Sequence, residues 1–102
     1  MIVVRDVFQI KYGRAKDAVS LWKEGRMFFA KAGFQNNSRL LTDLVGESYT
    51  LVLETTWDNL TAYEASFAKM MSAEFYEDWR KWYDKFVPLV ESGRREIFKL
   101  VE

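Results

Sequence analysis

The chain has 102 residues, enough for one domain with a single modest core, and it contains neither cysteine nor histidine. These two absences exclude disulfides, thiolate and imidazole catalysis and nearly every transition-metal site, so we expect no metal and no cofactor. Fifteen basic residues balance fifteen acidic ones, which gives no general reason to expect nucleic acid or an anionic membrane as a partner.

Aromatic residues make up 17% of the chain and include four tryptophans. We therefore expect large side chains between two packed layers, with room for a pocket. The N-terminus lacks the basic and then apolar pattern of a secretory signal, and no apolar run approaches the roughly 20 residues that span a bilayer. We expect a soluble, cytoplasmic protein in which residues 1–102 form one domain.

Residues 2–12 are rich in β-branched and aromatic side chains and predict a first strand. Its alternation places Val4 and Phe8 on one side, and Asp6 falls within the same apolar set. Two interpretations of Asp6 stay open, because the carboxylate can face a cavity or a bulge can turn it toward water.

Residues 14–32 carry apolar side chains, Trp22 among them, at helical spacing and predict the first long helix. Gly33 is placed to end this helix in a left-handed conformation. Phe34 would then contact Phe29, as the hydrophobic pair of a Schellman motif does.

Residues 38–45 and 49–57 predict two strands that form a hairpin through Gly46, Glu47 and Ser48. The first of them alternates poorly, so its register is undecided. The second alternates cleanly. The residues that share its apolar side are Tyr49, Leu51, Leu53, Thr55 and Trp57.

Residues 61–71 predict a second helix, because Asp58 and Asn59 supply turn and capping chemistry and Thr61 and Glu64 have the spacing of a capping box. We expect this helix to begin near Asn59 to Thr61.

Ser72 can cap a third helix over residues 72–92, with Pro88 bending it or making it irregular and Gly93 ending it. Its apolar stripe consists of Phe75, Trp79, Trp82, Phe86 and Leu89. Residues 94–102 alternate and predict a last strand. The order of elements predicts an α+β, ferredoxin-like split βαβ sandwich, with a four-stranded antiparallel sheet and helices on one face.

The other face of this sheet combines apolar and charged side chains. The mixture is too apolar for open solvent and too charged for the core of a monomer, which suits a self-complementary homodimer contact. The residues that we expect at this contact are Arg5, Val7, Val52, Glu54, Arg95, Ile97 and Lys99.

Three segments, VVRDVFQIKYGRAKDAVSLW, YTLVLETTWDNLTAYEASF and EFYEDWRKWYDKFVPLVESGRREIFKL, together resemble the dimeric α/β-barrel superfamily. Within it they are similar to NIPSNAP-like and antibiotic-biosynthesis-monooxygenase-like domains, most specifically in ETTWDNL and GRREIFKL. The resemblance implies a homodimer whose two sheets form a barrel, with a small-molecule pocket between sheet and helices in each subunit. Haem-processing relatives use a histidine that this chain lacks, which excludes a haem function through that ligand.

Six residues are candidates for lining such a pocket: Asp6, Trp22, Trp57, Tyr63, Trp79 and Tyr83. The aromatic ones can stack a flat apolar or aromatic ligand, or they can be ordinary core. Burial would raise the pKa of Asp6 or Glu54 toward that of a general base. For Glu54 we expect instead an ion pair with Arg5, Arg39, Arg95 or Lys99.

No catalytic residue is assigned from the sequence. The resemblance leaves open a cofactor-independent monooxygenase or isomerase that acts on a small apolar or aromatic substrate. It equally leaves open a non-enzymatic structural or protein-interaction module of the NIPSNAP-like type, with a filled core.

Overall fold

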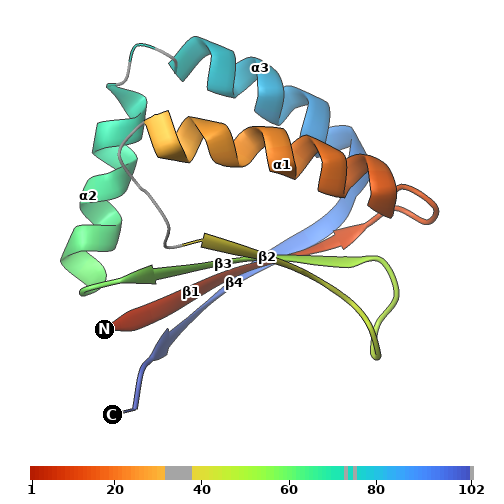
Figure 1. Cartoon of the computed structure of the whole chain (residues 1–102), viewed down its shortest axis with the longest axis horizontal. Helices are drawn as coiled ribbons and strands as arrows, with labels where there is room; N and C mark the ends of the chain where they lie inside the picture. The colour runs from red at the N-terminus through yellow and green to blue at the C-terminus, as the bar shows by residue number, and fades with distance from the viewer. Residues whose placement is uncertain (32–37, 73, 75, 102) are drawn as a thin grey trace.

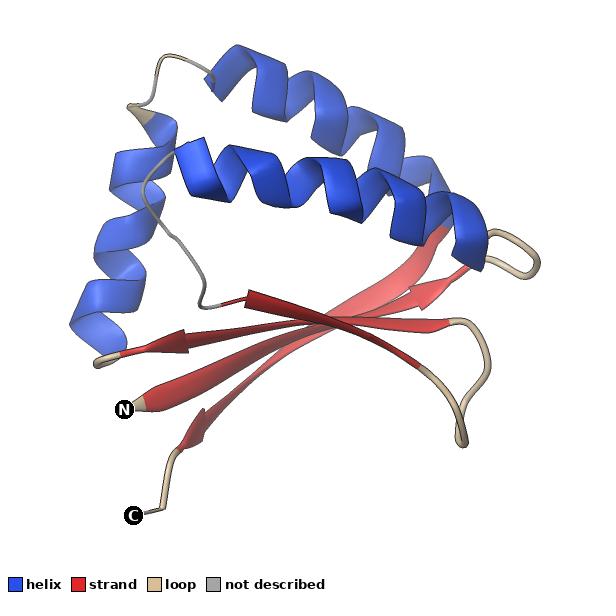
Figure 2. Ribbon diagram, viewed as in Figure 1, coloured by secondary structure: helices blue, strands red, loops and turns tan. Residues whose placement is uncertain are grey.

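The computed structural model describes residues 1–31, 38–72, 74 and 76–101. They form β1 (Ile2–Ile10), α1 (Ala15–Lys31), β2 (Ser38–Thr42), β3 (Thr50–Trp57), α2 (Leu60–Met71), α3 (Tyr76–Phe86), the 3₁₀ helix η1 (Val87–Leu89) and β4 (Val90–Lys99). The strands are antiparallel in the order β2-β3-β1-β4. All three α-helices lie on one face of this sheet, and no described helix covers the other (Figures 1 and 2). The predicted ferredoxin-like α+β fold is confirmed.

The register of β1 decides which residues face the helices. Asp6 lies opposite Leu53 of β3 on one side and Arg95 of β4 on the other. Directly opposed residues of an antiparallel pair point to the same face, and Leu53 belongs to the buried core under the helices. The pairing of β1 with β3 is regular from Ile2 to Gln9. Asp6 therefore faces the helices, and the alternative that a bulge turns it toward water is wrong.

The predicted face of the last strand is also wrong. Arg95, Ile97 and Lys99 share the helix-facing side with Asp6, whereas Glu96 and Phe98 lie on the open side. Apolar residues occur at both odd-numbered and even-numbered positions of this strand, so its hydrophobic pattern does not select a face. Pairing with β1 selects it instead.

The end of α3 differs from the predicted helix. The helix stops at Phe86, and Pro88 lies in η1, so the irregularity expected at this proline is confirmed. Ser72 caps the C-terminus of α2 and not the start of α3. Gly93 lies within β4, where an added Cβ would come 3.2 Å from Cδ1 of Phe8. Gly93 therefore makes room for the Phe8 ring and does not end a helix.

The start of α2 is set by Asn59 and not by the predicted capping box. The Asn59 side-chain oxygen accepts a hydrogen bond of 2.8 Å from the backbone N–H of Ala62. The expected start between Asn59 and Thr61 is confirmed, since the helix begins at Leu60. The predicted contact of Phe34 with Phe29 after Gly33 lies outside the described residues.

The core between sheet and helices is built on aromatic rings. The centroids of Trp22 and Trp82 lie 4.7 Å apart at an interplanar angle of 81°, and the indole N–H of Trp82 donates to the carbonyl of Leu21 at 2.7 Å. Gly25 lets α1 approach this ring, because an added Cβ would lie 2.6 Å from Cε2 of Trp82. The buried members of this core are Ile10, Ala18, Trp22, Leu51, Leu53, Trp82, Phe86 and Leu89.

Candidate functional site

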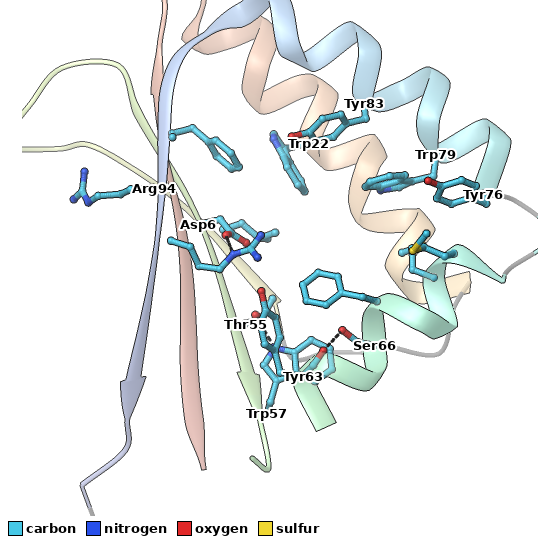
Figure 3. A pocket seen from close by; sticks show the side chains of 17 residues that line it. Asp6, Trp22, Thr55, Trp57, Tyr63, Ser66, Tyr76, Trp79, Tyr83 and Arg94 are labelled. Carbon is cyan, nitrogen blue, oxygen red and sulfur yellow. Dashed lines mark hydrogen bonds and ion pairs between the residues drawn. The ribbon is translucent and has the colours of Figure 1, made fainter. Parts of the chain in front are cut away.

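A cavity of about 600 Å³ lies between the helix-facing side of the sheet and the helices (Figure 3). All six residues that the sequence analysis places in a pocket line this cavity: Asp6, Trp22, Trp57, Tyr63, Trp79 and Tyr83. They come from β1, β3 and all three helices, so only the assembled fold brings them together. The volume falls within the range of roughly 300–1,000 Å³ that is typical of small-molecule sites.

The wall contributed by α3 is a ladder of stacked rings. Tyr76, Trp79 and Tyr83 follow one another at spacings of three and four residues, which places them on one side of a helix. The ring centroids of Tyr76 and Trp79 are 5.9 Å apart at 22°, and those of Trp79 and Tyr83 are 5.3 Å apart at 25°. This wall offers nearly parallel aromatic faces to a flat molecule.

The wall contributed by α2 and the end of β3 has rings in edge-to-face contact. The centroids of Trp57 and Tyr63 lie 5.6 Å apart at 60°, and those of Tyr63 and Phe67 lie 5.0 Å apart at 70°. The indole N–H of Trp57 donates to the hydroxyl of Thr55 at 2.9 Å, which orients the indole. The Tyr63 hydroxyl has a raised pKa, because burial disfavours the phenolate more than the nearby Arg95 favours it.

One ion pair crosses the sheet wall of the cavity. Nε of Arg95 lies 2.5 Å from Oδ1 of Asp6. The guanidinium carbon of Arg95 stands 5.8 Å from the ring centroid of Tyr63 and 5.6 Å from that of Phe67. Burial works against the charged form of Arg95, yet Asp6 and Tyr63 outweigh it, so the pKa of Arg95 is raised and its charge is retained.

Trp79, which lines the cavity, also has a buried polar atom. Its indole nitrogen is buried, and among the residues that the structure describes it has no hydrogen-bond acceptor. A buried N–H without an acceptor costs free energy.

Sequence reasoning missed several lining residues. Phe67 follows Tyr63 by one helical turn, Tyr76 precedes Trp79 by three residues, and Phe8 shares the alternation of Asp6. Each therefore carried a periodicity signal for the same side of its element.

Glu54 lies on the open face of the sheet and not in the cavity. It is 5% exposed and accepts hydrogen bonds from Nε of Arg5 at 2.9 Å and from the Arg39 guanidinium. The Arg39 hydrogen bond lowers the pKa of Glu54 below its ordinary value, and it outweighs the opposing effect of burial. The predicted pairing of Glu54 with Arg5 or Arg39 is confirmed, within one chain.

Two further observations concern metals and membranes. Among the described residues, no group of three or more histidine, cysteine, aspartate or glutamate side chains could hold a metal ion. None of the helices in that part of the chain is both long and apolar enough to cross a membrane.

No protein-family model matches the chain, and a search of curated proteins finds no significant relative. Solved structures do match. A NIPSNAP family protein from Agrobacterium tumefaciens has a TM-score of 0.85 at 17% identity, covering 99% of this chain and 93% of that one. A NIPSNAP domain protein from Burkholderia xenovorans has a TM-score of 0.81 at 15% identity, covering 99% and 95%. SnoaB, a cofactor-independent oxygenase from Streptomyces nogalater, has a TM-score of 0.70 at 14% identity, covering 99% and 93%. The resemblance to NIPSNAP-like and antibiotic-biosynthesis-monooxygenase-like domains is therefore confirmed at the level of the fold.

Proposed function

We propose that this protein binds a small, mostly apolar or aromatic molecule in the cavity between sheet and helices. The observation that carries the proposal is an open space of about 600 Å³ lined by Trp22, Trp57, Trp79 and other rings. A pure interaction module with a filled core needs no such space, so the cavity supports ligand binding over that alternative.

The candidate activity at this site is cofactor-independent oxygenation or isomerisation. Support comes from the fold shared with SnoaB and from the polar pair Asp6–Arg95 beside the aromatic walls. Fold-level analogy alone does not transfer a reaction. Oxygen uptake and product formation on each compound that binds would test the activity, and binding without turnover would leave a carrier or sensor function.

Binding is tested first, by tryptophan fluorescence titrated with quinones, polyphenols and fatty acids. Trp22, Trp57 and Trp79 line the cavity and should report its occupancy. Ser66→Phe would fill the cavity from α2, because Ser66 lines it, and should abolish the response. Ala65→Phe is the matched control, since the neighbouring Ala65 is exposed on the same helix. A response that survives Ser66→Phe, or none to any compound, would overturn the proposal.

We also propose that two copies associate through the open face of the sheet. Val7, Val52 and Phe98 are apolar on this face, with Arg5 standing 5.5 Å above the Phe98 ring. Arg94 and Glu96 add one charge of each sign. A face with apolar side chains and both charges is suited to contact itself across a twofold axis.

A further inference from the structure

We infer that the ligand of this cavity is uncharged and carries a hydrogen-bond donor beside an acceptor, as an aromatic carboxamide does. The Asp6–Arg95 pair would recognise this group, with Asp6 accepting and Arg95 donating. The inference rests on the proposed ligand-binding function and specifies the chemical class of the ligand.

The first argument is the charge of the cavity wall. Asp6, Arg94 and Arg95 are the charged residues among those that line it. Figure 3 shows the side chain of Arg94 directed away from the cavity, and its Nε lies 3.4 Å from a carboxylate oxygen of Glu96 on the open face. One anion and one cation therefore face the ligand, and their charges cancel.

The second argument is the hydrogen-bonding capacity that the pair retains. A carboxylate has two acceptor oxygens and a guanidinium has five N–H donors, and the bond between them joins one oxygen of Asp6 to Nε of Arg95. The side chains are 17% and 49% exposed, so both remain accessible. The rings of Tyr63 and Phe67 against the guanidinium restrict its orientation.

The third argument concerns which ligand groups this pair accepts. A ligand carboxylate would bring its charge close to Asp6, and a ligand cation would do the same to Arg95. In a cavity lined mostly by apolar atoms, the cost of removing a net charge from water would then not be offset. A neutral group with N–H beside C=O matches both partners at once.

The test uses four planar probes of nearly equal size that differ in one group: 2-naphthamide, 2-acetylnaphthalene, 2-naphthoate and 2-naphthamidinium. Isothermal titration calorimetry on the full chain should rank 2-naphthamide first. We expect it to bind about tenfold more tightly than the ketone, which lacks the donor. Both ions should bind more weakly than the amide.

Two single variants should reverse the preference in opposite directions. Asp6→Asn leaves the charge of Arg95 uncompensated, so 2-naphthoate should become the tightest probe. Arg95→Gln leaves Asp6 uncompensated, so 2-naphthamidinium should become the tightest. Lys81→Gln removes a charge from an exposed residue of α3 that does not line the cavity, so this control should keep the wild-type order, and melting curves establish that each variant is folded.

The outcomes separate this inference from the proposed function. Wild-type protein that binds the ketone as tightly as the amide, or either ion more tightly, overturns the inference while ligand binding stands. If none of the four probes binds the wild type and the wider fluorescence panel gives no response, both the inference and the proposed ligand-binding function are contradicted.

Discussion

At the scale of single residues, Glu54 shows how a buried carboxylate is kept ionised. It lies between Arg5 and Arg39 on the open face of the sheet. Glu54→Gln should lower the free energy of unfolding by roughly 1–3 kcal/mol, because two guanidinium groups lose their countercharge in a partly buried site. Urea denaturation measures the change. Glu24→Gln, on the exposed side of α1, is the control and should stay within about 0.5 kcal/mol of wild type.

The same residue predicts a pH dependence with a definite sign. The pKa of Glu54 is lower in the folded chain than its ordinary value of 4.5. The ionised carboxylate therefore contributes stability that is fully present above pH 4.5 and is lost as the pH falls through the folded pKa. The difference in unfolding free energy between wild type and Glu54→Gln should narrow as the pH falls below 4.5 and through the folded pKa of Glu54. A difference that is constant or grows toward acid pH would contradict the pairing.

At Gly25, core packing and helix propensity have opposite effects on stability. Alanine favours a helix over glycine by about 1 kcal/mol, yet a Cβ here would overlap the buried Trp82 ring. Gly25→Ala should therefore destabilise the protein by roughly 1–3 kcal/mol, since an aromatic ring in a packed core has little freedom to move. Thermal unfolding provides the measurement.

A double-mutant cycle tests that cause. The smaller ring of Trp82→Phe should tolerate Gly25→Ala at a lower cost, so the two changes should couple favourably. Additive effects would mean that the loss at Gly25 does not come from the Trp82 ring.

At the scale of elements, the start of α2 distinguishes two capping residues. Asn59→Ala should lower stability by about 1 kcal/mol, because the backbone N–H of Ala62 loses its acceptor. Thr61→Ala should change stability little, since Thr61 is an exposed residue inside the helix and not its cap. Chemical denaturation of both variants decides the matter. A larger loss of stability in Thr61→Ala than in Asn59→Ala would contradict this assignment and support the capping box predicted from the sequence.

At the scale of the whole molecule, the open sheet face predicts the assembly. Sedimentation at micromolar concentration should find a dimer of the wild-type chain. Phe98→Asp should give a folded monomer, because a carboxylate would replace an apolar side chain on the proposed interface. Met27→Asp changes an exposed apolar residue of α1 and should leave the dimer intact. A wild-type monomer, or dissociation by both variants alike, would contradict the proposed contact.

Local sequence patterns were sufficient for the class and order of the elements. The strict alternation of β3 and the helical spacing in α1 identify their buried sides, and Leu51, Leu53 and Trp22 are buried as expected. Alternation and helical spacing reflect the geometry of single elements, so they can be read without knowledge of partners. The aromatic lining of the cavity was predictable for the same reason.

Only the tertiary structure decided the face of β4 and the surroundings of Arg95. That strand has apolar residues at both odd-numbered and even-numbered positions. Its pairing with β1 places Arg95 beside Asp6 in the cavity. The sequence pattern had placed Arg95 on the open face. Likewise, Gly93 ends no helix, because its role depends on Phe8 from a distant strand. Partners across a sheet are set by register, which is a property of the assembled strands and leaves no local signal when neither face of a strand is clearly apolar.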